Sequence, residues 1–368
     1  MNTGSSSVRL GAFTNDGGTQ KEVASARLER SASSPANPEA ALTRFMEAHG
    51  FRTFSAAAHR VVHGGKNLTE SRLIDEKVEQ EIERLAVLAP LHNPVALRWI
   101  RAARQVLGPA VPQVAVFDTA FFTALPEVAR IYAIPHELTE QHGLWRYGFH
   151  GLAHQAMWLG WREQIPGDSL KGKVISLQLG SGCSITATAG GVPQDTSMGF
   201  SPLEGLVMAT RSGDIDAGLV TFLEDEKGFG PEQVDELLNE RSGLSGVSGI
   251  SADIRELLSS ANDQARLAVD LYCYRARKYV GSYLAVLNGA DAIIFGGGVG
   301  ENAAVVREKI LEGMEWCGIE LDQKKNRDHD RKEISCISRE ASRVEVWVIP
   351  VNEAALLAQE AESVLRNL

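Results

Sequence analysis

Three short apolar segments, each followed by a glycine turn or a helix, constrain the fold of this chain more than any other feature. Residues 174–179 (VISLQL) lead into the turn GSGCS and a returning run, ITAT, a pattern that predicts a β-hairpin. Residues 292–295 lead into GGGVGEN and a helix-like run over residues 303–313. Residues 344–351 lead into an amphipathic run over residues 354–365. Strands that alternate with helices in this way predict an α/β protein.

Further helices are predicted from apolar spacing over residues 38–49, 75–88, 94–107, 230–239 and 264–287. At roughly 150 residues per domain, a chain of 368 residues is expected to form two domains or one large one. Hydrophobic residues make up 44% of the chain, which excludes a mainly disordered protein. A glycine-rich turn near the N-terminus and the turn at Gly180 together hint at a duplicated nucleotide-binding half.

The charge balance argues against two classes of partner. The chain has 37 basic and 47 acidic residues and a net charge of −10, so we expect no nucleic-acid partner and no membrane partner.

The four cysteines are scattered, which favours a reduced, cytoplasmic protein without a disulfide framework. The N-terminus has no basic segment followed by an apolar core, and no run approaches the ~18 apolar residues of a membrane span.

Three glycine-rich turns could bind phosphate through backbone N–H groups: residues 4–7, 180–184 and 296–300. None is a Walker A loop, and none fits a dinucleotide-binding fingerprint. Each turn alone is more commonly an ordinary tight turn. Three in one acidic chain favour phosphate binding more than any one of them alone, because backbone dipoles need no net positive charge.

Two arginines and one aspartate lie in unusual contexts. Arg60 precedes the sequence VVHGG, and Arg211 lies in the turn TRSGDID; a guanidinium suits carboxylate and phosphoryl groups. A surface arginine is the ordinary alternative for each. Asp118 ends an apolar strand, where it either faces a ligand crevice or caps the next helix.

Two histidine pairs and two oxygen ligands complete the candidates. The pairs His59/His63 and His150/His154 have the spacing of zinc ligands on a helix, but the first pair favours a strand and the second begins at a turn. His150 is either a core residue or a hydrogen-bond donor to a reacting oxyanion. Asn2 and Glu353 carry side-chain oxygens of the type that Mg²⁺ accepts while keeping its waters.

Nine segments resemble the acetokinase family, the acetate kinases of the acetate and sugar kinase/Hsp70/actin superfamily, and they run in the family's order over nearly the whole chain. They are NTGSSS (2–7), HRVVHGG (59–65), APLHNP (89–94), VFDTAFFTALP (116–126), RYGFHGLAH (146–154), SPLEGLVMATRSGDID (201–216), GVSGISADIR (246–255), FGGGVGEN (295–302) and IPVNE (349–353).

The resemblance implies an α/β, duplicated ribonuclease-H-like (actin-like ATPase) fold with two domains around a nucleotide cleft, and a homodimer. It implies an N-terminal subdomain of residues 1–122 with 356–368, and a C-terminal nucleotide-binding and dimerisation subdomain of residues 123–355. The implied reaction is reversible, Mg²⁺-dependent transfer of a phosphoryl group from ATP to acetate, giving acetyl phosphate and ADP. Mn²⁺ is expected to substitute for Mg²⁺.

The resemblance also implies roles for individual residues. Arg60 is implied to bind the substrate carboxylate, and Arg211 and His150 to stabilise the transferring phosphoryl group. Asp118 matches the family's essential aspartate, which is described as a proton donor or acceptor. We expect Asp118 to position other groups, since a carboxylate nucleophile has no proton to remove near pH 7. The acyl pocket is implied at Val62, Leu91, Phe149 and Pro202. One methylene is worth only ~1–3 kcal/mol in such a pocket, so propionate is a second expected substrate.

Asn2 and Glu353 match the family's metal ligands, and Arg9 falls where the family has a phosphate-contacting lysine. The implied nucleotide-binding residues are Arg9, Gln178, Leu179, Gly180, Ser181, Gly182, Asp253, Ile254, Arg255, Gly298, Val299, Gly300, Glu301 and Asn302.

Departures from the family pattern leave alternatives open. Gln178 replaces a histidine, Cys183 a serine or alanine, Phe122 a histidine and Ala217 a proline. The alternatives are a propionate or short-chain acyl kinase, a weakly active relative with an altered phosphoryl donor, a non-catalytic actin/Hsp70-like nucleotide-binding module, and a zinc hydrolase. A β-strand is also expected ahead of Asn2, where only Met1 stands, so a mis-assigned start is expected.

Overall fold

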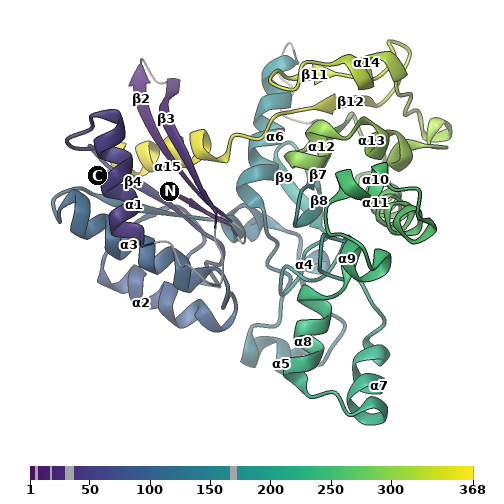
Figure 1. Cartoon of the computed structure of the whole chain (residues 1–368), viewed down its shortest axis with the longest axis horizontal. Helices are drawn as coiled ribbons and strands as arrows, with labels where there is room; N and C mark the ends of the chain where they lie inside the picture. The colour runs from purple at the N-terminus through teal and green to yellow at the C-terminus, as the bar shows by residue number, and fades with distance from the viewer. Residues whose placement is uncertain (5–6, 17–18, 30–36, 166–171, 368) are drawn as a thin grey trace. The chain divides into compact units, whose positions relative to one another are not determined.

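The structure is a computed structural model that describes residues 1–4, 7–16, 19–29, 37–165 and 172–367. The chain divides into two compact units (Figure 1). Unit 1 comprises Met1–Thr123, Phe149–Leu152 and Asn352–Leu368. Unit 2 comprises Ala124–Gly148 and Ala153–Val351.

The sheet of unit 1 contains β1 (Asn2–Thr3), β2 (Ser7–Asp16), β3 (Thr19–Glu29), β4 (Ala57–Val61), β5 (Arg72–Leu73) and β6 (Gln113–Phe117). Strands β1, β2 and β3 pair antiparallel, β4 pairs parallel with β6, and β5 pairs antiparallel with β6. Met1 joins the two groups of strands, because its amine donates to Ala58 O (2.7 Å) and its carbonyl accepts from Arg60 N (3.0 Å). The resulting order is β3-β2-β1-β4-β6-β5.

The sheet of unit 2 repeats this order. It contains β7 (Lys173–Leu179), β8 (Cys183–Ala189), β9 (Val192–Thr196), β10 (Ala292–Gly296), β11 (Ser335–Cys336) and β12 (Glu345–Val348). Its order is β9-β8-β7-β10-β12-β11, with β10 parallel to β7 and β12 parallel to β10. Strands β8, β9 and β11 pair antiparallel with their neighbours. The chain therefore contains one strand topology twice, as the two glycine-turn hairpins suggested.

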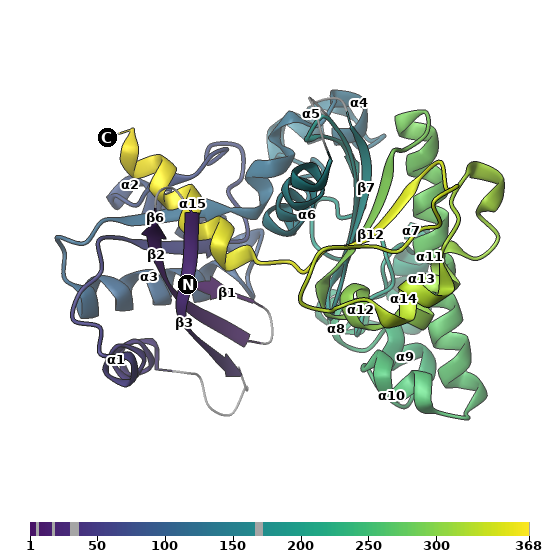
Figure 2. The same cartoon turned by 90° about the horizontal axis from the view of Figure 1, so that it is seen from above.

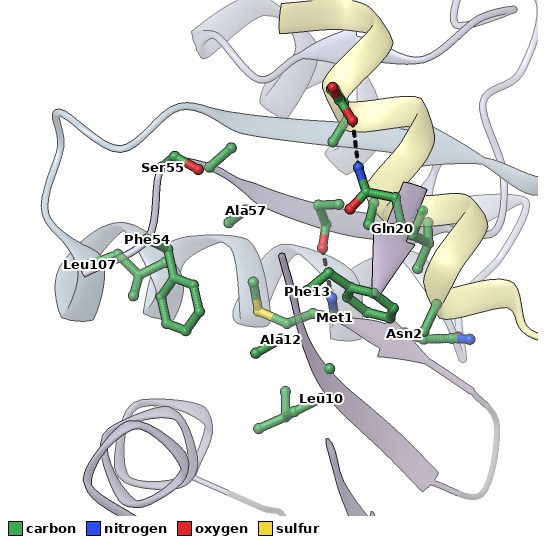
Figure 3. Close-up of a pocket in the computed structure, with 18 of the residues that line it drawn as sticks. Met1, Asn2, Leu10, Ala12, Phe13, Gln20, Phe54, Ser55, Ala57 and Leu107 are labelled. Atoms are coloured by element: carbon green, nitrogen blue, oxygen red, sulfur yellow. Dashed lines mark hydrogen bonds between the residues drawn. The ribbon is translucent and has the colours of Figure 1, made fainter. Parts of the chain in front are cut away.

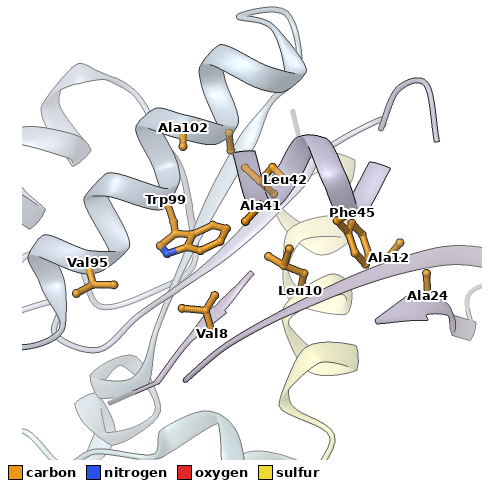
Figure 4. Packing of buried hydrophobic residues seen from close by; sticks show 11 residues of the cluster. Val8, Leu10, Ala12, Ala24, Ala41, Leu42, Phe45, Val95, Trp99 and Ala102 are labelled. Atoms are coloured by element: carbon orange, nitrogen blue, oxygen red, sulfur yellow. The ribbon is translucent and has the colours of Figure 1, made fainter. Parts of the chain in front are cut away.

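In unit 1, α1 (Pro38–His49) and α3 (Asn93–Leu107) pack on one face of the sheet, and α15 (Glu353–Arg366) lies on the other (Figure 2). Figure 4 shows the first face, where Leu10 of β2 meets Phe45 and Trp99 of the helices. The remaining helices of this unit are α2 (Glu76–Arg84), η1 (Leu85–Val87) and η2 (Asp118–Ala124), the last of which ends just past its boundary. The side chains of Asn37 and Asp75 cap the first turns of α1 and α2, which is why these helices begin there.

In unit 2, α11 (Asp263–Leu287) packs against β7, β8 and β9, and Asn262 caps its first turn. The other helices of unit 2 are α4 (Glu127–Arg130), α5 (His136–His142), α6 (Gly151–Gln164), α7 (Ala217–Lys227), α8 (Pro231–Glu240), α9 (Gly243–Ser248), α10 (Ile254–Ser259), α12 (Gly297–Asn302), α13 (Ala304–Leu311), η3 (Glu315–Cys317) and α14 (Gln323–Asp328). The first two residues of α6 belong to unit 1. The turn predicted over residues 296–300 was wrong in part, because a short helix already begins at Gly297. In the described ranges, no helix has the length and apolar content that a bilayer crossing requires.

A groove of about 390 Å³ opens in unit 1 between β2 and the start of β4 (Figure 3). Residues 10–13 of β2 and residues 55–58 border it, while Leu107 and Phe45 line one side and Leu357 of α15 lines the other. Only β1 and β3 pair with β2 among the described residues, and β1 reaches no further along β2 than Arg9. The groove therefore has the shape of a strand position within the sheet, with apolar walls on both faces.

We expect a variant with Val-Ile-Val-Ile-Val inserted ahead of Met1 to be more stable than the unmodified chain. An apolar strand there would extend β1, and each buried side chain would contribute roughly 1.5–3 kcal/mol against about 1–2 kcal/mol of backbone ordering per residue. The measurement is the urea midpoint of unfolding, with a Gly-Ser-Gly-Ser-Gly insertion as the control. Equal midpoints for both insertions would contradict the interpretation of the groove.

Candidate active site

Arg60 and Asp118 form a buried ion pair at one end of the unit 1 sheet. Arg60 lies on β4, and Asp118 follows the last residue of β6, the parallel neighbour of β4. Arg60 Nε donates to Asp118 Oδ1 (2.9 Å), and Nη2 donates to Oδ2 (2.6 Å). Arg60 is 8% exposed and Asp118 is not exposed. The Asp118 carboxylate is therefore directed at the Arg60 guanidinium on the neighbouring strand.

The two buried charges stabilise each other against the cost of leaving water. Burial raises the pKa of Asp118, and the adjacent Arg60 guanidinium opposes that rise. Burial acts to lower the pKa of Arg60, but the charges of Asp118 and Glu353 outweigh it, so its pKa lies above the ordinary value. The guanidinium is therefore a permanent cation held in a fixed orientation.

Asn2 and Glu353 lie beside this pair, although 351 positions separate them in the chain. Asn2 Nδ2 donates to Glu353 Oε2 (2.5 Å), and Asn2 Oδ1 accepts from Arg60 Nη1 (3.1 Å). Glu353 Oε2 lies 3.5 Å from Arg60 Nη1. One carboxylate and one amide oxygen suit Mg²⁺, which keeps most of its waters and takes further oxygens from phosphates. Within the described ranges, no group of three or more His, Cys, Asp or Glu side chains forms a fuller metal site.

His150 adjoins Asp118 through the backbone. It has a left-handed φ of 58°, and its backbone hydrogen bond to Asp118 favours the ionised carboxylate. A Cβ at Gly151 would lie 2.0 Å from Asp118 O, so only glycine permits this approach. The Phe149 ring meets the His63 ring edge-on at 5.7 Å between centroids. Of the predicted acyl-pocket residues in unit 1, Val62 and Phe149 are buried and Leu91 is exposed.

Unit 2 brings Arg211 and the Gly180 turn together. Ala209 N donates to Ser181 O (3.1 Å), which ties the segment before Arg211 to the β7–β8 turn. Arg211 Nη1 donates to Pro202 O (3.2 Å), so the two predicted residues are in contact. Burial lowers the pKa of Arg211, as expected of a partly desolvated cation. Within the turn, Gly180 N donates to Gly182 O (3.1 Å).

Two departures from the family pattern border this turn. The Cys183 thiol is buried and lies 3.3 Å from Gly180 O and 3.2 Å from Tyr272 Oη, so it points into the protein. Burial raises the pKa of this thiol. Gln178 is half-buried, and its Oε1 accepts no hydrogen bond from the residues that the structure describes. Phe122, the departure near Asp118, is buried against Phe121.

The other residues predicted to bind the nucleotide lie on several separate elements of the two units. Asp253 caps α10 and pairs with the exposed Arg255 (Nη2 to Oδ2, 2.5 Å). Leu179 and Ile254 are buried, whereas Gly298, Val299 and Gly300 lie in α12 with Glu301 and Asn302. In unit 1, Arg9 donates to both carboxylate oxygens of Glu22 on β3 (2.9 Å each). Gly4 N donates to Ser7 O (2.9 Å), while residues 5 and 6 of the predicted N-terminal turn lie outside the described residues.

The histidine pairs have separate partners. His59 Nε2 lies 2.7 Å from the Gln113 side chain, and His63 Nδ1 accepts from Gly65 N (3.0 Å). His154 is buried between two hydroxyls, with Nδ1 2.7 Å from Ser176 Oγ and Nε2 2.8 Å from Ser184 Oγ. Sequence reasoning missed this packing role, which residue spacing does not reveal.

We expect His154 to make the protein less stable in acid. Burial lowers the pKa of His154 to about 3, whereas the unfolded chain binds this proton near pH 6.5. The unfolded state therefore binds more protons below pH 6.5, and the stability present above that pH is lost as pH falls, by up to about 1.4 kcal/mol per pH unit. Urea midpoints at pH 7.5 and 5 should differ less for His154→Gln than for the unmodified protein. His142→Gln, at an exposed position, is the control; an unchanged pH effect in His154→Gln would refute the expectation.

Comparison with known proteins places this geometry in a family. The sequence profile of the acetokinase family matches residues 15–359. An acetate kinase of Chloroherpeton thalassium is 49% identical over 309 residues, covering 83% of this chain and 74% of the relative. The crystal structure of Porphyromonas gingivalis acetate kinase matches with a TM-score of 0.84 and 38% identity, covering 93% of this chain and 88% of that one. A Francisella tularensis propionate kinase matches with a TM-score of 0.86 and 34% identity, covering 98% and 97%.

These matches confirm the resemblance that the nine sequence segments indicated. The structural matches also confirm the predicted two-domain, actin-like ATPase fold, which the repeated strand order displays within this chain. The profile covers the segments that carry Arg60, Asp118, Arg211 and Glu353. The chain belongs to the acetokinase family.

Proposed function

We propose that this protein catalyses reversible phosphoryl transfer from ATP to acetate, giving acetyl phosphate and ADP. A carboxylate oxygen of acetate attacks the γ-phosphorus, and the bond from that phosphorus to the oxygen of ADP breaks. The observation that carries the proposal is the Arg60 guanidinium, fixed by Asp118 and bordered by Asn2 and Glu353. This arrangement places a permanent cation, which can bind a carboxylate, beside two side-chain oxygens of the kind that bind Mg²⁺ together with phosphates.

Arg60 would hold the substrate carboxylate. A guanidinium has five N–H donors, and Asp118 and Asn2 accept only some of them, which leaves donors for a carboxylate. We propose that Val62, Leu91 and Phe149, with Pro202 of unit 2, contact the acyl chain. A pocket of this kind separates acetate from propionate by only ~1–3 kcal/mol, so propionate would also be a substrate.

Asp118 would act as a positioning residue. It accepts three hydrogen bonds from Arg60 and is not exposed, and the nucleophile carries no proton for it to remove. By fixing the plane of the Arg60 guanidinium, Asp118 would keep the attacking oxygen of acetate in line with the γ-phosphorus. Such positioning removes entropy from the barrier before the chemical step.

The phosphate-binding groups would come mainly from unit 2. We propose that backbone N–H groups of the Gly180 turn bind phosphate, that residues 253–255 and 298–302 contact the nucleotide, and that Arg9 assists from unit 1. Arg211 and His150 would stabilise the negative charge on the equatorial oxygens of the transferring phosphoryl group. This electrostatic stabilisation is larger in a site that is shielded from water. The contact between the Arg211 segment and Ser181 supports this assignment.

Asn2 and Glu353 would hold Mg²⁺, for which Mn²⁺ could substitute. When bound, the ion would neutralise phosphate charge and orient the phosphates. We further propose a cytoplasmic homodimer, and a division into subdomains of residues 1–122 with 356–368 and residues 123–355. Family resemblance supports the dimer and the division, and the free cysteines Cys183, Cys273, Cys317 and Cys336 fit a reducing compartment.

The test is acyl hydroxamate formation with acetate, propionate and butyrate. We expect product from acetate and propionate with ATP and Mg²⁺, restored activity with Mn²⁺ after EDTA treatment, and little product with pyrophosphate as the donor. Product with pyrophosphate but not with ATP would show an altered donor. No product with any acid and either donor, from folded protein, would overturn the kinase assignment.

A further inference from the structure

One carboxylate oxygen in unit 2 accepts hydrogen bonds from two distant backbone segments. Glu301 Oε1 lies 3.0 Å from Gly297 N and 3.1 Å from Val351 N. Gly297 begins α12, and Val351 lies beyond the end of β12, 50 positions further along the chain. A single acceptor oxygen therefore joins two backbone segments that are distant in the sequence.

The first segment borders the phosphate side of the proposed site. Gly297 has a φ of 76°, and a Cβ there would lie 2.6 Å from Leu179 O and 2.8 Å from Gln178 Nε2. Residues 178 and 179 end β7, directly before the Gly180 turn. The backbone at Gly297 is thus packed against the strand end that carries the turn, without room for a side chain.

The second segment leads to the metal side of the proposed site. Val351 is followed by Asn352, which caps α15, and by Glu353, the first residue of that helix. Val351 is therefore the last residue of unit 2 before the helix whose first carboxylate is the proposed Mg²⁺ ligand.

Arg307 holds the backbone of Glu301 from the opposite direction. Its side chain is fully buried, and Nη1 donates to Gly300 O (2.7 Å) and Glu301 O (3.1 Å). Its other nitrogens donate to Asn326 Oδ1 (2.8 Å) and Asn326 O (2.7 Å). A buried cation satisfied by carbonyl oxygens fixes the end of α12, so the Glu301 side chain projects from a rigid base.

We propose that Glu301 is a positioning residue that links the nucleotide-side segment at Gly297 to the metal-side segment at Val351. The proposal rests on the proposed function, because it assigns ATP phosphate to the Gly180 turn and Mg²⁺ to Glu353. It changes the role expected of Glu301 from contacting the nucleotide to holding the two segments that do. Removal of the carboxylate releases both amides together, whereas a glutamine keeps one oxygen that accepts from both.

The first test is hydrogen–deuterium exchange of the full-length protein without ligands, which needs no activity. In Glu301→Ala, peptides that contain Gly297 and Val351 should both exchange about tenfold faster, the size expected for losing one charged hydrogen bond. Glu301→Gln should restore most of the protection. Glu308→Ala, an acidic position on the next helix, is the matched control and should change neither peptide. Faster exchange at only one of the two segments would overturn the link.

The second test separates positioning from general destabilisation. In Glu301→Ala, the KM for ATP and the Mg²⁺ concentration for half-maximal rate should rise together by about tenfold, while the KM for acetate changes less than twofold. A rise in the KM for ATP without a rise in the Mg²⁺ requirement would contradict the proposal. An equal rise in the KM for acetate would also contradict it. If the unmodified protein forms no acyl phosphate, the proposed function fails, and the exchange experiment still decides whether Glu301 links the segments.

Discussion

Arg211→Ala is expected to lower kcat by about 10²–10³-fold without lowering the thermal midpoint. The loss of a donor aimed at developing charge costs about that much in other enzymes. Stability should survive because the described hydrogen bonds of the guanidinium go to the Pro202 carbonyl and the Met208 thioether, none to a carboxylate. Burial already disfavours the charge, as its lowered pKa indicates, so alanine removes a desolvation cost.

The matched control for Arg211→Ala is Arg241→Ala. Arg241 is an exposed arginine of the same unit, and its Nη1 lies 3.9 Å from Glu236 Oε1. It should leave kcat within twofold of the unmodified enzyme. Added guanidinium ion should restore part of the activity of Arg211→Ala and none in the control, since it supplies the missing charge. Near-normal turnover of Arg211→Ala would remove this residue from the transition-state role.

Arg60→Met is expected to lower the free energy of unfolding by about 3–5 kcal/mol and to abolish detectable activity. Removing one partner of a buried ion pair leaves the other charge uncompensated, and the loss is of that size. Here the partner is Asp118, whose side chain is 1% exposed and which loses all three hydrogen bonds from the guanidinium. Urea denaturation monitored by circular dichroism measures the stability.

The pH dependence of the stability of Arg60→Met tests whether the uncompensated charge of Asp118 causes the loss. Burial raises the pKa of Asp118, and without Arg60 only the backbone hydrogen bond from His150 opposes that rise. The folded state then binds more protons than the unfolded state, so the stability deficit should be small at low pH and should grow as pH rises through the folded-state pKa. The double variant Arg60→Met/Asp118→Asn should recover much of the loss at pH 7.5, because it buries no charge. A deficit that is independent of pH and persists in the double variant would exclude the ion pair as its origin.

The local elements of the fold were largely predictable from the sequence. Helices α1 and α11 begin and end within one residue of their predicted bounds, because apolar spacing and the capping residues Asn37 and Asn262 act within a few residues. The hairpin at Gly180 was predicted for the same reason. The helix that begins at Gly297 was missed, since glycine runs usually favour turns.

The sequence by itself determined the fold class, the family and the types of residue that could bind a carboxylate and phosphates. Only the tertiary structure decided which of them meet. Arg60 and Asp118 lie 58 positions apart, and parallel pairing of β4 with β6 brings them to one end of the sheet. The link made by Glu301 had no sequence signal, because its partners are backbone N–H groups that every residue except proline carries. Residue type encodes local preference, whereas burial and long-range pairing determine which charges face one another.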